Sequence, residues 1–173
     1  MSLKVFPAIL CLPLVFLSCL QATTMTPLAA SNIVHQQAQF AKIATMLAEP
    51  IAVNDLGLVA LRSGQYVLDL WGLGSIEALH YRQSHANAEW MRELMDKKHV
   101  KYAFVYEAWF IYKPKNWIKV GELKLLQKRI TPAYDSVSLY ATDPSSVAKL
   151  SATLREFLHT QNNNPAFSLS IMQ

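Results

Sequence analysis

The chain has 173 residues, of which 52% are hydrophobic, and its formal net charge at pH 7 is +4. This length accommodates one ordinary domain with a short additional segment, and so mild a positive charge gives no reason to expect nucleic acid as a partner. Both cysteines, Cys11 and Cys19, lie near the N-terminus, so disulfide frameworks, thiolate metal sites and cysteine nucleophiles are excluded from the rest of the chain.

The first part of the chain is a hydrophobic segment, which we place at residues 1–27. No charged side chain occurs between Val5 and Val34, and the stretch VFPAILCLPLVFLSCL is apolar apart from Ser18. Such a segment is typical of membrane insertion or secretion and not of a soluble core.

Three interpretations of this segment stay open. Its apolar core is slightly short for a retained span, which needs about 20 residues, and slightly long for a cleaved signal peptide, whose core has about 7–15. A lipid anchor on Cys19 is the third, although Phe16-Leu17-Ser18 is a poor lipobox. For a span or a signal, Lys4 favours an N-terminus inside the cytoplasm and the remainder outside it.

We expect one extracytoplasmic domain at residues 28–161 and a tail at residues 162–173. Its first half predicts a helix at 28–49, a buried strand at 51–53, a short helix or second apolar run at 56–61 and a strand at 66–70. Its second half predicts a helix at 87–98, strands at 100–109 and 136–142, an ambiguous segment at 117–126 and a helix at 143–161. Alternating helices and strands predict an α/β fold: a small, mostly parallel sheet flanked by helices, preceded by the N-terminal hydrophobic helix.

The loops after the first two predicted strands hold the candidate ligand-binding residues. If these strands are parallel neighbours, Asp55 and Asp69 lie at the carboxyl edge of the sheet, where α/β folds bind ligands. The candidates are Asn54, Asp55, Gly57, Asp69, Gly72, Gly74 and Ser75. Ordinary turn chemistry explains the same residue types without a ligand.

Catalytic and cofactor motifs are missing from the sequence. Gly72-Leu73-Gly74-Ser75 lacks the third glycine of a dinucleotide fingerprint, and no Walker A, HExxH or GxSxG pattern occurs. We therefore predict no catalytic residue, metal or cofactor, and keep a hydrolase that uses Asp55 and Asp69 as a remote alternative. Glu107, among aromatic and β-branched residues, lies either at an exposed edge or in a desolvated functional site.

The segment from Lys113 to Arg129 holds six basic residues and one acidic residue, Glu122, and the aromatic residues Trp109, Tyr112 and Trp117 lie in or beside it. Lys113, Lys115, Trp117 and Lys119 are the candidate membrane-facing residues of this segment, because such clusters are attracted to anionic headgroups. The same composition also describes an ordinary soluble edge.

Two stretches carry a family resemblance: SNIVHQQAQFAKIATML and IAVNDLGLVALRSGQYVLDLWGLGSIE. They resemble the C-terminal extracytoplasmic region of bacterial multi-pass membrane glycosyltransferases of the GT-C type, and of related uncharacterised membrane proteins. The matching motifs are Asn32-Ile33, Gln36-Gln37, Asn54-Asp55-Leu56-Gly57 and Asp69-Leu70-Trp71-Gly72-Leu73.

The resemblance implies a function by binding or positioning. The family has many membrane spans and catalytic acidic residues in an early extracytoplasmic loop, to which nothing in this chain corresponds. We therefore expect a detached or truncated C-terminal module that transfers no sugar alone, with a membrane lipid, a lipid-linked sugar or another membrane protein as partner. The alternative is a secreted periplasmic α/β protein that binds a small polar ligand.

Overall fold

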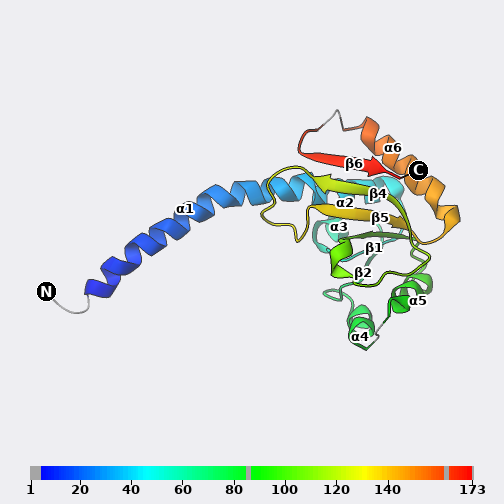
Figure 1. The fold of residues 1–173 in the computed structure, drawn as a ribbon, viewed down its shortest axis with the longest axis horizontal. Helices are drawn as coiled ribbons and strands as arrows, with labels where there is room; N and C mark the ends of the chain where they lie inside the picture. The colour runs from blue at the N-terminus through cyan, green and yellow to red at the C-terminus, as the bar shows by residue number, and fades with distance from the viewer. Residues whose placement is uncertain (1–4, 85–86, 162–163, 173) are drawn as a thin grey trace.

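A computed structural model describes residues 5–84, 87–161 and 164–172 (Figure 1). It contains one six-stranded sheet with the strand order β2-β1-β3-β5-β4-β6. Helices cover both faces of the sheet, and a long apolar helix projects from one side of the domain (Figure 1). The predicted α/β fold with an N-terminal hydrophobic helix is confirmed.

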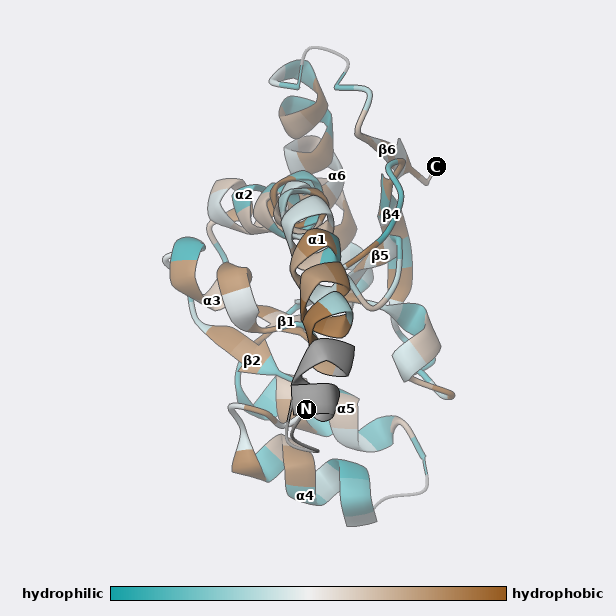
Figure 2. Cartoon of the chain, turned by 90° about the vertical axis from the view of Figure 1, so that its left-hand side faces the viewer, coloured by the Kyte–Doolittle hydropathy of each residue, from teal (hydrophilic) through white to brown (hydrophobic). Residues whose placement is uncertain are grey.

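The projecting helix is α1 (Val5–His35), which is followed directly by α2 (Gln37–Leu47). Large side chains on all sides of α1 are exposed, among them Leu12, Leu14 and Leu17, and its outer half is mostly hydrophobic (Figure 2). By length and composition, the helical run Cys11–Leu47 is the one candidate membrane span among the described residues. The single helix predicted at 28–49 is in fact the end of α1 plus α2, with a turn at Gln36.

The first half of the domain alternates strands and helices as predicted. Its elements are β1 (Ile51–Val53), α3 (Gly57–Arg62), β2 (Val67–Asp69), α4 (Ile76–Ser84), α5 (Glu89–Lys97) and β3 (Tyr102–Val105). β1 pairs in parallel with both β2 and β3, because helices cross over between these strands. α4 lies in a segment for which the sequence predicts no element.

The second half is antiparallel, and the predicted mostly parallel sheet is therefore wrong. Its elements are the 3-10 helix η1 (Glu107–Trp109), β4 (Ile118–Leu125), β5 (Ser136–Ala141), α6 (Pro144–His159) and β6 (Phe167–Ile171). β5 pairs antiparallel with β3 and β4, and β4 pairs antiparallel with β6. The physical reason is the absence of a helical crossover between β3 and β5, since parallel neighbours need one.

The predicted tail at 162–173 needs a correction, because part of it is a strand of the sheet. Residues 167–171 form the edge strand β6, which pairs with β4 from Gly121 to Leu125. Phe167 is buried and its ring lies 6.2 Å from that of Phe157 in α6, so this segment belongs to the core.

Two apolar cores lie on the two faces of the sheet. α2, α3 and α6 pack on one face through residues such as Phe40, Val59 and Leu154. α4 and α5 pack on the other through Ala78 and Met91. Neighbouring strand residues alternate between the two cores, as the period of a strand requires.

The carboxyl ends of β1, β2 and β3 lie at the edge of the sheet from which α1 departs. The segment between β4 and β5 contacts the last turn of α1, where Ser31 Oγ donates to Gln127 Oε1 (3.0 Å). β5 starts beside this contact and runs antiparallel to β3, so β3 and its parallel partners end there. The loops at 54–57 and 70–75 are consequently on the α1 side of the domain.

Candidate functional site

Asp69 organises the loop that follows β2. Its side chain is only 2% exposed. Oδ1 accepts hydrogen bonds from the backbone N–H groups of Trp71 (2.8 Å) and Gly72 (3.1 Å), and Oδ2 accepts one from Gly74 (2.6 Å). A carboxylate with three such donors is occupied by its own loop, so the described geometry favours turn chemistry at this candidate.

The other loop residues fit the same interpretation. Gly72 has a φ of +91°, and a Cβ there would lie 2.7 Å from Leu79. A Cβ on Gly74 would lie 2.8 Å from Leu56 Cδ2, so the two candidate loops pack closely against each other. Ser75 Oγ accepts from the backbone N–H of Ala78 at the start of α4 (3.2 Å), and Gly57 begins α3.

Asn54 and Asp55 belong to a polar network at the carboxyl end of β1. Asn54 Oδ1 accepts from the backbone N–H of Tyr106 (3.0 Å). Asp55 Oδ2 accepts from Gln37 Nε2. The Tyr106 hydroxyl has one hydrogen, and the two acceptors within reach of it are Gln36 Oε1 (2.8 Å) and Asp55 Oδ2 (3.1 Å). Burial, and secondarily the negative charge of Asp55, raises the pKa of the Tyr106 hydroxyl. This network joins α1 and α2 to the carboxyl edge of the sheet.

The basic segment does not form the predicted membrane-facing surface as a whole. Trp117 is buried and its ring packs 5.3 Å from that of Tyr140, so the prediction is wrong for this residue. Lys113 Nζ and Lys119 Nζ lie 3.4 and 3.3 Å from the Glu107 carboxylate. Lys115 is exposed, but it precedes Asn116, which bonds to the Thr142 carbonyl at the edge opposite α1.

Glu107 is the centre of an ionic cluster on the sheet. Its carboxylate accepts from the Tyr140 hydroxyl and pairs with both lysines. Burial alone would raise its pKa, but hydrogen bonds from Tyr140, Ser138 and Lys119 outweigh burial and lower the pKa from 4.5 to about 2. Glu107 is therefore ionised near pH 7, and its charge is paired and hydrogen-bonded. The sequence left two alternatives for this residue, an exposed edge or a desolvated functional site, and the half-buried ionic cluster is intermediate between them.

This pKa predicts a specific acid sensitivity. Because the folded pKa is below the ordinary value, Glu107 stabilises the fold above about pH 5, and this contribution is lost as the pH falls towards 2. Glu107→Gln should therefore give a free energy of unfolding that depends less on pH in this window than that of the unchanged chain. Urea unfolding at a series of acidic pH values measures both slopes, and parallel slopes would contradict the prediction.

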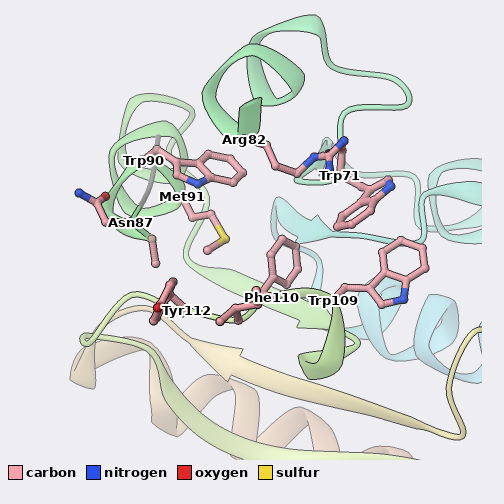
Figure 3. A pocket seen from close by; sticks show the side chains of 10 residues that line it. Trp71, Arg82, Asn87, Trp90, Met91, Trp109, Phe110 and Tyr112 are labelled. Carbon is pink, nitrogen blue, oxygen red and sulfur yellow. Dashed lines mark hydrogen bonds between the residues drawn. The ribbon is translucent and has the colours of Figure 1, made fainter. Parts of the chain in front are cut away.

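An aromatic pocket of about 250 Å³ lies between β2, α4, α5 and η1 (Figure 3). Its lining includes three of the four tryptophans of the chain, Trp71, Trp90 and Trp109. The rings of Trp71 and Trp109 are 4.5 Å apart, and Phe110 meets Trp71 edge-on at 6.1 Å. Figure 3 shows these rings arranged around a common space, into which Met91 also points.

Polar groups border this pocket at a few places. The Arg82 guanidinium lies 4.1 Å from the centre of the Trp71 ring, and Arg82 Nε donates to the Trp71 carbonyl (3.0 Å). Asn87 and Tyr112 line the opposite end, where a second pocket of about 260 Å³ continues towards Lys113 and Lys115. Mostly apolar walls with a few convergent polar groups are typical of small-ligand sites.

Sequence reasoning missed this pocket. It assigns Trp90 and Met91 to the apolar face of a helix, and no element was predicted for the segment that contains Arg82. Trp71 and Trp109 each follow a strand that ends at the same edge of the sheet, but the strand predicted at 100–109 included Trp109 and so concealed this signal. Within the described residues, no group of three or more His, Cys, Asp or Glu is placed to hold a metal ion.

Comparison with known proteins identifies a family but no activity. No curated protein and no solved structure matches the chain. A family model matches residues 30–140, a region that runs from the end of α1 to β5 and contains the aromatic pocket. The chain therefore belongs to the family described as a domain of unknown function, DUF8728.

Proposed function

We propose that this chain is a membrane-attached, extracytoplasmic binding domain that holds the sugar of a lipid-linked saccharide in the aromatic pocket. It positions this ligand and transfers no sugar alone. The observation that carries the proposal is the grouping of Trp71, Trp90 and Trp109 around one pocket with Arg82 at its border. The resemblance to the C-terminal region of GT-C glycosyltransferases agrees with this ligand class.

The chemistry of the pocket suits a saccharide. Sugar rings have apolar C–H faces that pack on indole rings, and hydroxyl groups at their edges that need hydrogen-bonding partners. Trp71 is half-buried, so part of this residue is accessible. Arg82 and Asn87 supply polar groups at the border of the pocket.

The proposed attachment rests on α1. Ser18, Thr23 and Thr24 donate their hydroxyl groups to carbonyls one turn earlier, those of Leu14, Cys19 and Leu20. Polar groups satisfied within the helix suit a hydrocarbon environment, which offers no water. Lys4 favours a cytoplasmic N-terminus, which leaves the domain outside. The intact mass of the expressed chain distinguishes this attachment from release by signal cleavage.

A small polar ligand bound at the 54–57 and 69–75 loops is the weaker alternative. Such a ligand would have to compete with the loop's own N–H groups for Asp69 and with Tyr106 and Gln37 for Asp55.

The proposal predicts that Trp71→Ala weakens binding of a polyprenyl-phosphate-linked sugar about tenfold or more, as expected for a tryptophan at the centre of a site. Tyr66→Ala is the matched control, because Tyr66 is a 49% exposed aromatic residue that precedes β2, at the opposite edge. Affinities are measured on the full chain in detergent, with a panel of such sugars and with polyprenyl phosphate that carries no sugar. Equal affinity for glycosylated and unglycosylated lipid, or equal effects of both variants, would contradict the proposal.

A further inference from the structure

The segment Leu126–Tyr134, which we name the basic loop, is fixed to the end of α1. The buried side chain of Asn32 accepts from the backbone N–H of Ile130 (2.6 Å) and donates to the Lys128 carbonyl (3.1 Å). Gln36, which is fully buried, donates to the carbonyls of Tyr134 (2.9 Å) and Asp135 (2.8 Å). The position of the basic loop along the axis of α1 is therefore set by these bonds (Figure 1).

This position is close to a bilayer surface if α1 spans the membrane. A hydrocarbon core takes about 20 helical residues, which places its outer boundary near Thr24 when the span begins after Lys4. Asn32 is eight residues further along, or about 12 Å at the helical rise. The headgroup layer is about 5–8 Å thick, so the long side chains of the basic loop extend to its outer boundary.

The side chains of the basic loop suit such a surface. Lys128 and Arg129 are adjacent and exposed, and Leu126 and Tyr134 are 55% and 40% exposed beside them. Arg129 donates to the carbonyls of Pro132 (2.9 Å) and Ala133 (2.7 Å), which holds the loop in shape. The nearby Asp135 carboxylate lies 3.9 Å from Lys124, and the ion pairs found among the described residues do not include Lys128.

We propose that the basic loop contacts the phosphate groups of anionic lipids in the leaflet from which α1 emerges. The Lys128 ammonium is the principal contact. Charge attraction of this kind acts within a Debye length, about 8–10 Å at physiological salt. The inference rests on the membrane attachment in the proposed function but not on its saccharide ligand.

The test uses the full chain in nanodiscs of phosphatidylcholine, with and without phosphatidylglycerol. In a Cys11→Ser/Cys19→Ser background, a fluorophore is attached at Thr131→Cys in the basic loop or at Ala148→Cys on α6, both of which are exposed positions. Lipids with a spin label on the headgroup quench fluorophores that lie close to the surface. We expect strong quenching at position 131, stronger still with phosphatidylglycerol and weaker at high salt, and little quenching at position 148.

Lys128→Gln should remove most of the phosphatidylglycerol-dependent quenching at position 131. Lys101→Gln is the matched control, since Lys101 is an exposed lysine that precedes β3 at the opposite edge, and it should leave the quenching unchanged. Equal quenching at positions 131 and 148, or quenching at 131 that does not respond to phosphatidylglycerol, would overturn the inference. A chain that has lost α1 shows a reduced mass and contradicts the attachment itself, whereas failure to bind a saccharide leaves these outcomes unaffected.

Discussion

Replacing Asp69 with asparagine should lower the free energy of unfolding by about 2–4 kcal/mol. The asparagine keeps one carbonyl oxygen for the N–H groups of Trp71 and Gly72, but it places an NH₂ group opposite the N–H of Gly74, which now bonds to Oδ2 at 2.6 Å. Two facing donors at a site that is 2% exposed leave a buried group unpaired, and an unpaired buried group costs about 1–3 kcal/mol, more when a charge-assisted bond is lost.

Asp55→Asn is the matched comparison for this variant. Asp55 is half-buried and its partners are the side chains of Gln37 and Tyr106, which can reorient, so we expect a loss of about 1 kcal/mol or less. Urea unfolding of both variants in detergent gives the two values. An Asp69→Asn variant as stable as the unchanged chain would show that the carboxylate is not needed by the loop, which would revive the ligand-binding interpretation.

Gln36→Leu should be the most damaging single change at the junction of α1 with the domain. It removes both bonds to the carbonyls of Tyr134 and Asp135 and the acceptor for the Tyr106 hydroxyl. The hydroxyl keeps Asp55 as a partner at 3.1 Å, and the Asp135 carbonyl keeps the backbone N–H of Leu125 (2.8 Å), but the Tyr134 carbonyl loses its bond to the buried Gln36 side chain. We expect a loss of about 2–3 kcal/mol, with faster hydrogen exchange in the basic loop.

Gln39→Leu provides the control for this change of side-chain type. Gln39 bonds to the nearby Val34 carbonyl on an exposed side of the helix, and its replacement should cost less than about 0.5 kcal/mol, as is usual at surfaces. Similar losses for both variants would contradict the assigned role of Gln36, and so would unchanged exchange in the basic loop.

Local signals in the sequence predicted much of the first half of the fold. Pro50 ends the helical run before β1, and Asp143-Pro144 marks the start of α6, where Asp143 Oδ1 accepts from the Ser146 N–H (3.0 Å). The parallel pairing of β1 and β2 brings Asp55 and Asp69 to one edge, as expected. These features depend on caps, breakers and hydrophobic periodicity, which act over a few residues.

The second half could not be predicted in the same way, because strand direction depends on contacts between distant residues. The segment 117–126 is ambiguous in isolation, and it becomes β4 by pairing with β5 on one side and β6 on the other. β6 has no local signal that outweighs the preceding Asn162-Asn163-Asn164-Pro165 sequence. α4 was missed because it is weakly amphipathic. Only Ala78 among its nine residues is buried, so the helix has no apolar stripe that the sequence could reveal.

The candidate site was predicted only in part. The loops at 54–57 and 69–75 were recognised from their acidic residues and glycines, but their partners are backbone groups and distant side chains that spacing does not reveal. The aromatic pocket needs Arg82 from α4 to meet Trp71 from the loop after β2. The basic residues near α1, Lys128 and Arg129, were recognised as part of a charged segment, but the membrane-facing role was assigned to its other end.

The four tryptophans give the most direct test of the central claim, that the aromatic pocket binds the sugar of a lipid-linked saccharide. Three of them line the pocket, whereas Trp117 is buried against Tyr140 outside it. Titration of the ¹⁵N-labelled full chain with a polyprenyl-phosphate-linked sugar should shift the indole N–H signals of Trp71 and Trp109 and leave that of Trp117 in place. The same shifts with unglycosylated polyprenyl phosphate, or no shift at Trp71 and Trp109 at saturating ligand, would contradict it.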